Sequence, residues 1–85
     1  MTNLNQRDEA LKAIAEDAAA VGETGLVKQA LEKFTVANLK DEAAASCALT
    51  LYAAGKDQAA VEVAKEMSNV NKRDEVLQKI AKGKQ

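Results

Sequence analysis

Three Asp–Glu pairs recur along the chain, and paired carboxylates are a type of group that does chemistry. The pairs stand at positions 8–9, 41–42 and 74–75, in steps of 33 residues. Neighbouring carboxylates are typical of metal sites and of acid–base catalysis. However, consecutive residues diverge by about 100° around a helix, so the two members of a pair do not converge on one site. The chain also lacks the acidic loop pattern that binds calcium, so we expect no metal and no cofactor.

The single cysteine, Cys47, is the other candidate for chemistry. The chain contains no histidine, which removes the commonest general base and the His–Cys pair. A thiol becomes a nucleophile when its neighbours activate it. The residues 33 positions before and after Cys47 are Ile14 and Ile80, so we expect the thiol to fill an apolar slot in the core. The sequence therefore predicts a protein that is not an enzyme.

The elements that carry these residues follow from the same 33-residue period. A glycine recurs at positions 22 and 55, and an alanine at 15, 48 and 81. Periods of this length are typical of helical repeat proteins. The copies run at about 7–39, 40–72 and 73–85, and the third stops after one helix. We interpret residues 1–85 as a single domain, because a chain of this length builds one core.

Apolar spacing in each copy predicts helices and no strands. We expect five helices, at about 6–21, 25–35, 41–54, 58–68 and 72–82. Gly22 and Gly55 should end the first and third, because glycine takes a positive φ after a helix at low cost. Thr24 and Asp57 are the expected N-caps of the second and fourth.

The starts of the first, third and fifth helices share one pattern. Three asparagines occupy the expected N-cap positions: Asn5, Asn38 and Asn71. Three aspartates follow three residues later, as in a capping box: Asp8, Asp41 and Asp74. Capping leaves a repeated cation without a role: Arg7, Lys40 and Arg73. These cations would bridge either to the preceding loop or to the neighbouring copy, and the sequence leaves both open.

Charge and hydropathy limit the partners. The net charge is −1 with mixed signs, which offers no broad basic field for nucleic acid. Residues 72–85 carry +3 and the remainder −4, which suits the last turn of a helix or, less simply, head-to-tail stacking. No apolar segment of 18 residues occurs, so we expect no membrane association. A lone cysteine fits a reducing compartment, and we expect a cytoplasmic protein.

With its glycines aligned, the repeat resembles the tetratricopeptide repeat, a helix–turn–helix unit of about 34 residues. Its signature positions are matched by small or apolar residues: Ala15, Ala48 and Ala81; Ile14, Cys47 and Ile80; and the turn glycines Gly22 and Gly55. The family's tryptophan position departs from the signature: it holds Leu11, Ala44 and Leu77. The chain is therefore closest to the degenerate tetratricopeptide-like repeats of small bacterial proteins.

This resemblance implies an all-α, right-handed stack of helical hairpins, with about 2.5 repeats and five helices. In the family, the first helices of the units line a groove that holds peptides or partner helices. The corresponding positions here are Glu9, Lys12, Glu16, Glu42, Ala45, Leu49, Tyr52, Glu75, Gln78 and Lys82. Tyr52 is either an anchor for a partner or a cover for the end of its helix. The resemblance thus implies a non-catalytic protein-binding module; the alternative is a self-associating structural protein, built by end-to-end stacking or hairpin exchange.

Overall fold

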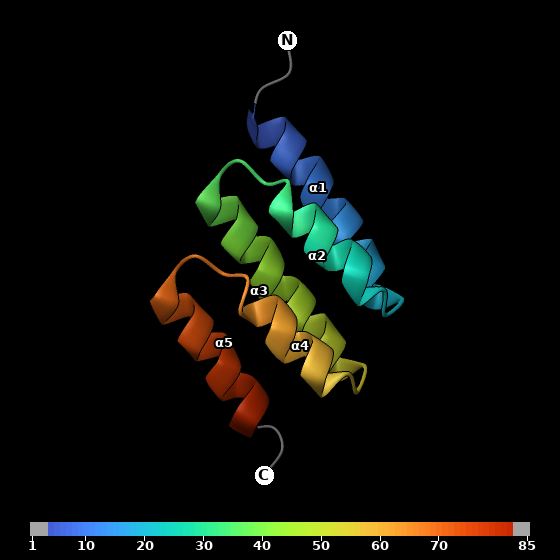
Figure 1. Ribbon diagram of the computed structural model, residues 1–85, viewed down its shortest axis with the longest axis vertical. Helices are drawn as coiled ribbons and strands as arrows, with labels where there is room; N and C mark the ends of the chain where they lie inside the picture. The colour runs from blue at the N-terminus through green and yellow to red at the C-terminus, as the bar shows by residue number, and fades with distance from the viewer. Residues whose placement is uncertain (1–3, 83–85) are drawn as a thin grey trace.

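The computed structural model describes residues 4–82, and over that range the chain is all-helical, without strands. Its five helices are α1 (Leu4–Ala20), α2 (Thr24–Glu32), α3 (Ala37–Ala53), α4 (Asp57–Ala64) and α5 (Val70–Lys82). α1 packs against α2 and α3, and α3 packs against α4 and α5. Figure 1 shows α1, α3 and α5 following one another along the long axis, with α2 and α4 against them. The predicted all-α class with five helices is confirmed.

The turns after α1 and α3 have the geometry that their glycines predict. Gly22 and Gly55 have φ values of 79° and 86°. After α1, the N–H of Glu23 donates to the carbonyl of Ala18 at 2.8 Å, and the N–H of Gly22 to that of Ala19 at 3.0 Å. These two bonds form a Schellman motif, which satisfies carbonyls at the helix end. The same pair of bonds closes α3, at Gly55 and the residue after it.

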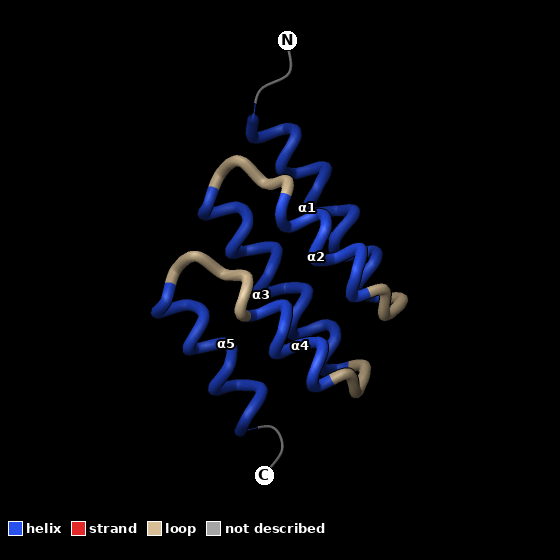
Figure 2. Tube along the Cα trace, in the orientation of Figure 1, coloured by secondary structure: helices blue, strands red, loops and turns tan. Residues whose placement is uncertain are grey.

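The predicted N-caps of α2 and α4 are displaced by one residue. Thr24 and Asp57 are the first helical residues, while Glu23 and Lys56 hold the N-cap positions. The Schellman motif explains this shift. Its last residue, Glu23 or Lys56, is also the N-cap of the following helix. The turns are therefore one residue tighter than the cap pattern suggested, and Figure 2 shows both as short tan segments on the right-hand side of the molecule.

The longer loops, residues 33–36 and 65–69, correct the predicted helix boundaries. α2 ends at Glu32 rather than near 35, and α3 begins at Ala37 rather than near 41. α4 likewise ends at Ala64, before the predicted 68. Backbone N–H groups of residues 35, 36, 68 and 69 donate to aspartate side chains of earlier helices. Those N–H groups are therefore satisfied outside any helix, and the chain leaves the helix there.

The predicted caps of α3 and α5 are wrong. Asn38 and Asn71 lie inside the first turns of these helices. Asn5 likewise lies within α1, and its side chain is outside the described part of the chain. At α5 the capping side chain is Asn69, whose Oδ1 accepts the N–H of Lys72 at 3.1 Å. The N-caps of α3 and α5 therefore lie two residues before the predicted positions.

The core is built mainly from alanine, with a few larger side chains. Leu31, Leu51 and Ile80 are the largest fully buried apolar residues, and Cys47 is buried among them as expected. Small residues let helix axes approach closely, so these few large side chains fill the remaining space. Three apolar residues of α1 and α2 are exposed: Ala10, Ile14 and Leu26. Ile14 and Leu26 border one shallow depression that is formed by residues of α1, α2 and the loop after α2.

Candidate binding groove

An open groove of about 370 Å³ is lined by residues of α1, α3 and α5. Its lining comes from three helices and the loop before α5: Lys12, Asp41, Glu42, Ala45, Leu49, Met67, Lys72, Glu75, Val76 and Lys79. α3 supplies the middle of the groove, because it packs against both α1 and α5. No helix in residues 4–82 is long and apolar enough to cross a membrane.

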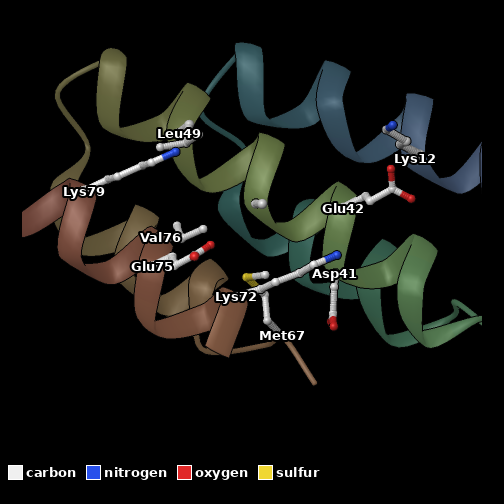
Figure 3. Close-up of a pocket in the computed structure, with 10 residues that line it drawn as sticks. Lys12, Asp41, Glu42, Leu49, Met67, Lys72, Glu75, Val76 and Lys79 are labelled. Atoms are coloured by element: carbon white, nitrogen blue, oxygen red, sulfur yellow. The ribbon is translucent and has the colours of Figure 1, made fainter. Parts of the chain in front are cut away.

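The groove has an apolar floor and a charged rim. Met67 and Val76 are buried beneath it, while Leu49 is 37% exposed beside them. Figure 3 shows Lys79 extending from α5 toward α3, and Lys12 facing α3 from α1 on the far side. An apolar strip between charged side chains is the surface that binds amphipathic segments, since it gives both burial and orientation.

Asp41 lines the groove but uses its carboxylate to hold the structure together. Its Oδ1 accepts the N–H of Ser68 at 2.7 Å, and its Oδ2 accepts that of Asn69 at 2.9 Å. These residues lead directly into α5, so the carboxylate fixes the position of that helix against α3. One wall of the groove is therefore set by a buried aspartate on the opposite wall.

Asp8 performs the same task one repeat earlier. Its carboxylate accepts the N–H of Val36 at 2.7 Å, and both the N–H and the hydroxyl of Thr35 at 3.1 Å. Burial alone would raise the pKa of Asp8, but the bonds from Val36 and Thr35 and the positive charge of Arg7 outweigh it and hold the pKa below its usual value. The capping-box role predicted for Asp8 and Asp41 is thus wrong, because both carboxylates bind a loop two helices away.

The repeated cation acquires a role from this geometry. Arg7 stabilises the ionised form of Asp8 electrostatically. In the third copy, Nε of Arg73 lies 3.6 Å from Oδ1 of Asp74. A separate ion pair, Lys28 Nζ to Glu62 Oε1 at 3.2 Å, links α2 to α4. In the first copy, Arg7 therefore favours the charged carboxylate of Asp8, which strengthens the bonds that Asp8 accepts.

The residues assigned to the groove by resemblance fall in three places. Five of them line it together: Lys12, Glu42, Ala45, Leu49 and Glu75. Gln78 and Lys82 border a second, polar depression along α5. Glu9 and Glu16 on α1 lie outside both. Tyr52 is half-buried, packs against the core and does not line the groove.

Five lining residues were not expected in the groove from the sequence: Asp41, Met67, Lys72, Val76 and Lys79. Three of them stand at intervals of four and three along α5, on the same helical stripe as Glu75. That stripe was visible in the sequence as a mixed charged and apolar face. It was not predicted as groove-lining because the expected groove positions on α5 followed the family pattern.

Cys47 is an inert packing residue in this environment. Its side chain is fully buried, and burial, reinforced by Glu16, raises its pKa to about 11, while Lys12 opposes this. At neutral pH the group is therefore the protonated thiol, which is a poor nucleophile. Within residues 4–82, no three acidic or cysteine side chains are arranged to hold a metal ion.

Comparisons of the chain with protein families, with curated proteins and with solved structures gave no match. The resemblance to tetratricopeptide repeats therefore stays a prediction that rests on the residues themselves.

Proposed function

We propose that this protein is a non-catalytic binding module whose groove between α1, α3 and α5 takes a peptide or a partner helix. In this proposal the helices form a right-handed stack of two hairpins closed by α5, as in tetratricopeptide-like repeats. The observation that carries the proposal is the groove of about 370 Å³ with Leu49 exposed between charged walls. A leucine left open at the middle helix favours an apolar anchor from a partner.

The charged side chains at the rim of the groove indicate which charges should flank the partner's apolar anchor. Three ammonium groups border the groove, those of Lys12, Lys72 and Lys79. Two carboxylates oppose them, from Glu42 and Glu75, since the carboxylate of Asp41 is bound to the loop before α5. The complementary ligand is an aliphatic residue flanked by acidic side chains, because rim charges select a partner by sign.

The test is a peptide selection followed by a matched pair of variants. Random peptides displayed on phage are selected on the protein, and we expect enrichment of an aliphatic residue beside Asp or Glu. Binding of one selected peptide is then measured by fluorescence anisotropy. Leu49→Arg should weaken it at least about tenfold, which corresponds to about 1.4 kcal/mol. Leu26→Arg is the control, because Leu26 is a similarly exposed leucine outside the groove.

Two results contradict the proposal. One is a selection that enriches no common peptide pattern. The other is an equal loss of binding in the Leu26→Arg and Leu49→Arg variants, with both proteins retaining wild-type helicity by circular dichroism.

A further inference from the structure

Equivalent positions of the 33-residue repeat differ in burial at the start of the chain. Ile14, Cys47 and Ile80 stand in one register, yet Ile14 is 55% exposed while the other two are 0% and 1% exposed. Cys47 is covered by α1, whose Lys12 and Glu16 influence its pKa. Ile80 lies on α5, which packs only against α3 and α4 among the described helices. The repeat position of Ile14, Cys47 and Ile80 therefore faces the preceding copy of the repeat. No copy precedes α1 within the described residues.

The opposite difference occurs on the last helix. Asp8 and Asp41 are buried, and each binds the loop that enters the next odd-numbered helix. Asp74, the third member of that register, is exposed. Alanine follows the same rule: Ala15 and Ala48 are fully buried, and Ala81 is exposed. This second register faces the following copy, which is missing beside α5 within the described residues.

Two complementary surfaces result. We call the first the leading face: it consists of Ala10, Leu11, Ile14 and Leu26, and it borders a shallow depression of about 160 Å³. We call the second the trailing face: it consists of Asp74 and Ala81 on α5. Residues 72–85 carry +3, whereas the rest of the chain carries −4, so the chain has a charge difference between its C-terminal segment and the remainder.

We propose that the leading face of one chain packs on the trailing face of a second copy, head to tail. The occupant is a second copy because the chain already contains this contact internally, where α3 follows α1 and where α5 follows α3. In the assembly, α1 of the second copy takes the place beside α5 that α5 itself takes beside α3. Asp74 then lies beside the N-terminal end of that α1, where the helix dipole favours a carboxylate.

This contact is heterologous, so it leaves one free face of each kind at the two ends of an assembly. Such contacts grow into open chains rather than stopping at a closed dimer. It uses neither wall of the groove, and it stands whether or not the groove binds a peptide. We therefore expect the mean molar mass to exceed the 9.0 kDa of one chain and to rise steadily with protein concentration.

The decisive experiment blocks each face separately and then mixes the variants. Ile14→Lys places a charge on the leading face, and Ala81→Arg places bulk and charge on the trailing face. Both positions are exposed, so both variants should keep wild-type helicity by circular dichroism. In sedimentation analysis each variant alone should have the mass of one chain. Their equimolar mixture should give twice that mass and no more, because it holds only one competent pair of faces.

Matched controls separate this contact from other effects. Val21→Lys adds a charge at an exposed position whose repeat equivalent, Ala54, is also exposed, so it should assemble like the wild type. Leu49→Arg in the groove should also leave assembly unchanged. The proposal is overturned if the wild type keeps the mass of one chain at every concentration, if either blocked variant still associates, or if the mixture stays monomeric. A wild-type mass that stops at two chains also contradicts it, because that indicates a symmetric contact.

Discussion

The loops that enter α3 and α5 have the same task but are built from different residues. Both are held by an aspartate two helices earlier, through the N–H groups of two successive residues. In the first loop Thr35 adds its hydroxyl to the bonds of Asp8, and Val36 stands at the N-cap without a capping side chain. In the second loop Asn69 caps α5 itself.

The comparison separates what the repeat requires from what it tolerates. The carboxylate is present in both loops, and it is nearly fully buried in both. The polar side chain of the loop changes from a hydroxyl that binds the carboxylate to an amide that binds the next helix. The carboxylate is therefore the common device that sets one helix against another, and the loop side chain is a local adjustment.

The largest effect is expected when the common device is removed. Asp41→Ala leaves two N–H groups without their charged acceptor, and bonds to charged groups are among the stronger ones. We expect the free energy of unfolding to fall by roughly 2–4 kcal/mol. The measurement is the urea midpoint of the circular dichroism signal at 222 nm, with an unchanged m-value. This loss is a large part of the stability of a small domain, which is about 5–15 kcal/mol.

Asp74→Ala is the matched control, because Asp74 holds the same repeat position but is exposed. Surface substitutions usually change stability by less than about 0.5 kcal/mol, and we expect no more here in dilute protein. Equal losses in the two variants would show that the loop bonds of Asp41 contribute nothing beyond removal of an acidic residue.

An acid titration sharpens the comparison at the first loop. Because the folded-state pKa of Asp8 lies below its ordinary value of 3.8, the unfolded chain binds a proton more readily than the folded one. The stability that Asp8 contributes is therefore present above about pH 3.8 and is lost as the pH falls below it. Asp8→Asn lacks this contribution at every pH. The difference in urea midpoint between wild type and Asp8→Asn should shrink from pH 7 to pH 2; a constant difference would contradict the assignment.

These loops also mark where sequence reasoning succeeded and where it failed. The turn glycines were predicted with their positive φ, because glycine after a helix depends on local backbone preference alone. The aspartates were found as a repeat but given a local role in capping. Their actual partners stand 27 and 28 residues later in the chain. A contact across the fold cannot be distinguished by spacing from a cap three residues away, because both require an acidic residue near a helix start.

The core and the groove show the same division. Cys47 was predicted to be buried because its repeat partners are isoleucines. Cys47 is buried, and so is its partner Ile80. The other partner, Ile14, is exposed, because burial in a repeat protein depends on the neighbouring unit as much as on the residue. Lys79 and Val76 line the groove although the family pattern placed other residues of α5 there. Registers inside a helix were predictable, whereas the side that a neighbour covers was not.

The smallest effect tests the local adjustment at the two helix starts. Asn69→Ala removes the bond to the N–H of Lys72, and loss of an N-cap costs about 1 kcal/mol of stability. Asn38→Ala is the partner change at α3: the sequence pattern makes Asn38 a cap, but it lies exposed inside the first turn. We expect Asn38→Ala to leave the urea midpoint unchanged or slightly higher, because alanine has the better helix propensity. Asn69→Asp should keep the wild-type midpoint, since a carboxylate caps as well as an amide. If Asn38→Ala costs as much as Asn69→Ala, Asn38 caps α3, and that helix begins two residues later than the structure indicates. Each loop would then lead into a helix that is capped by an asparagine.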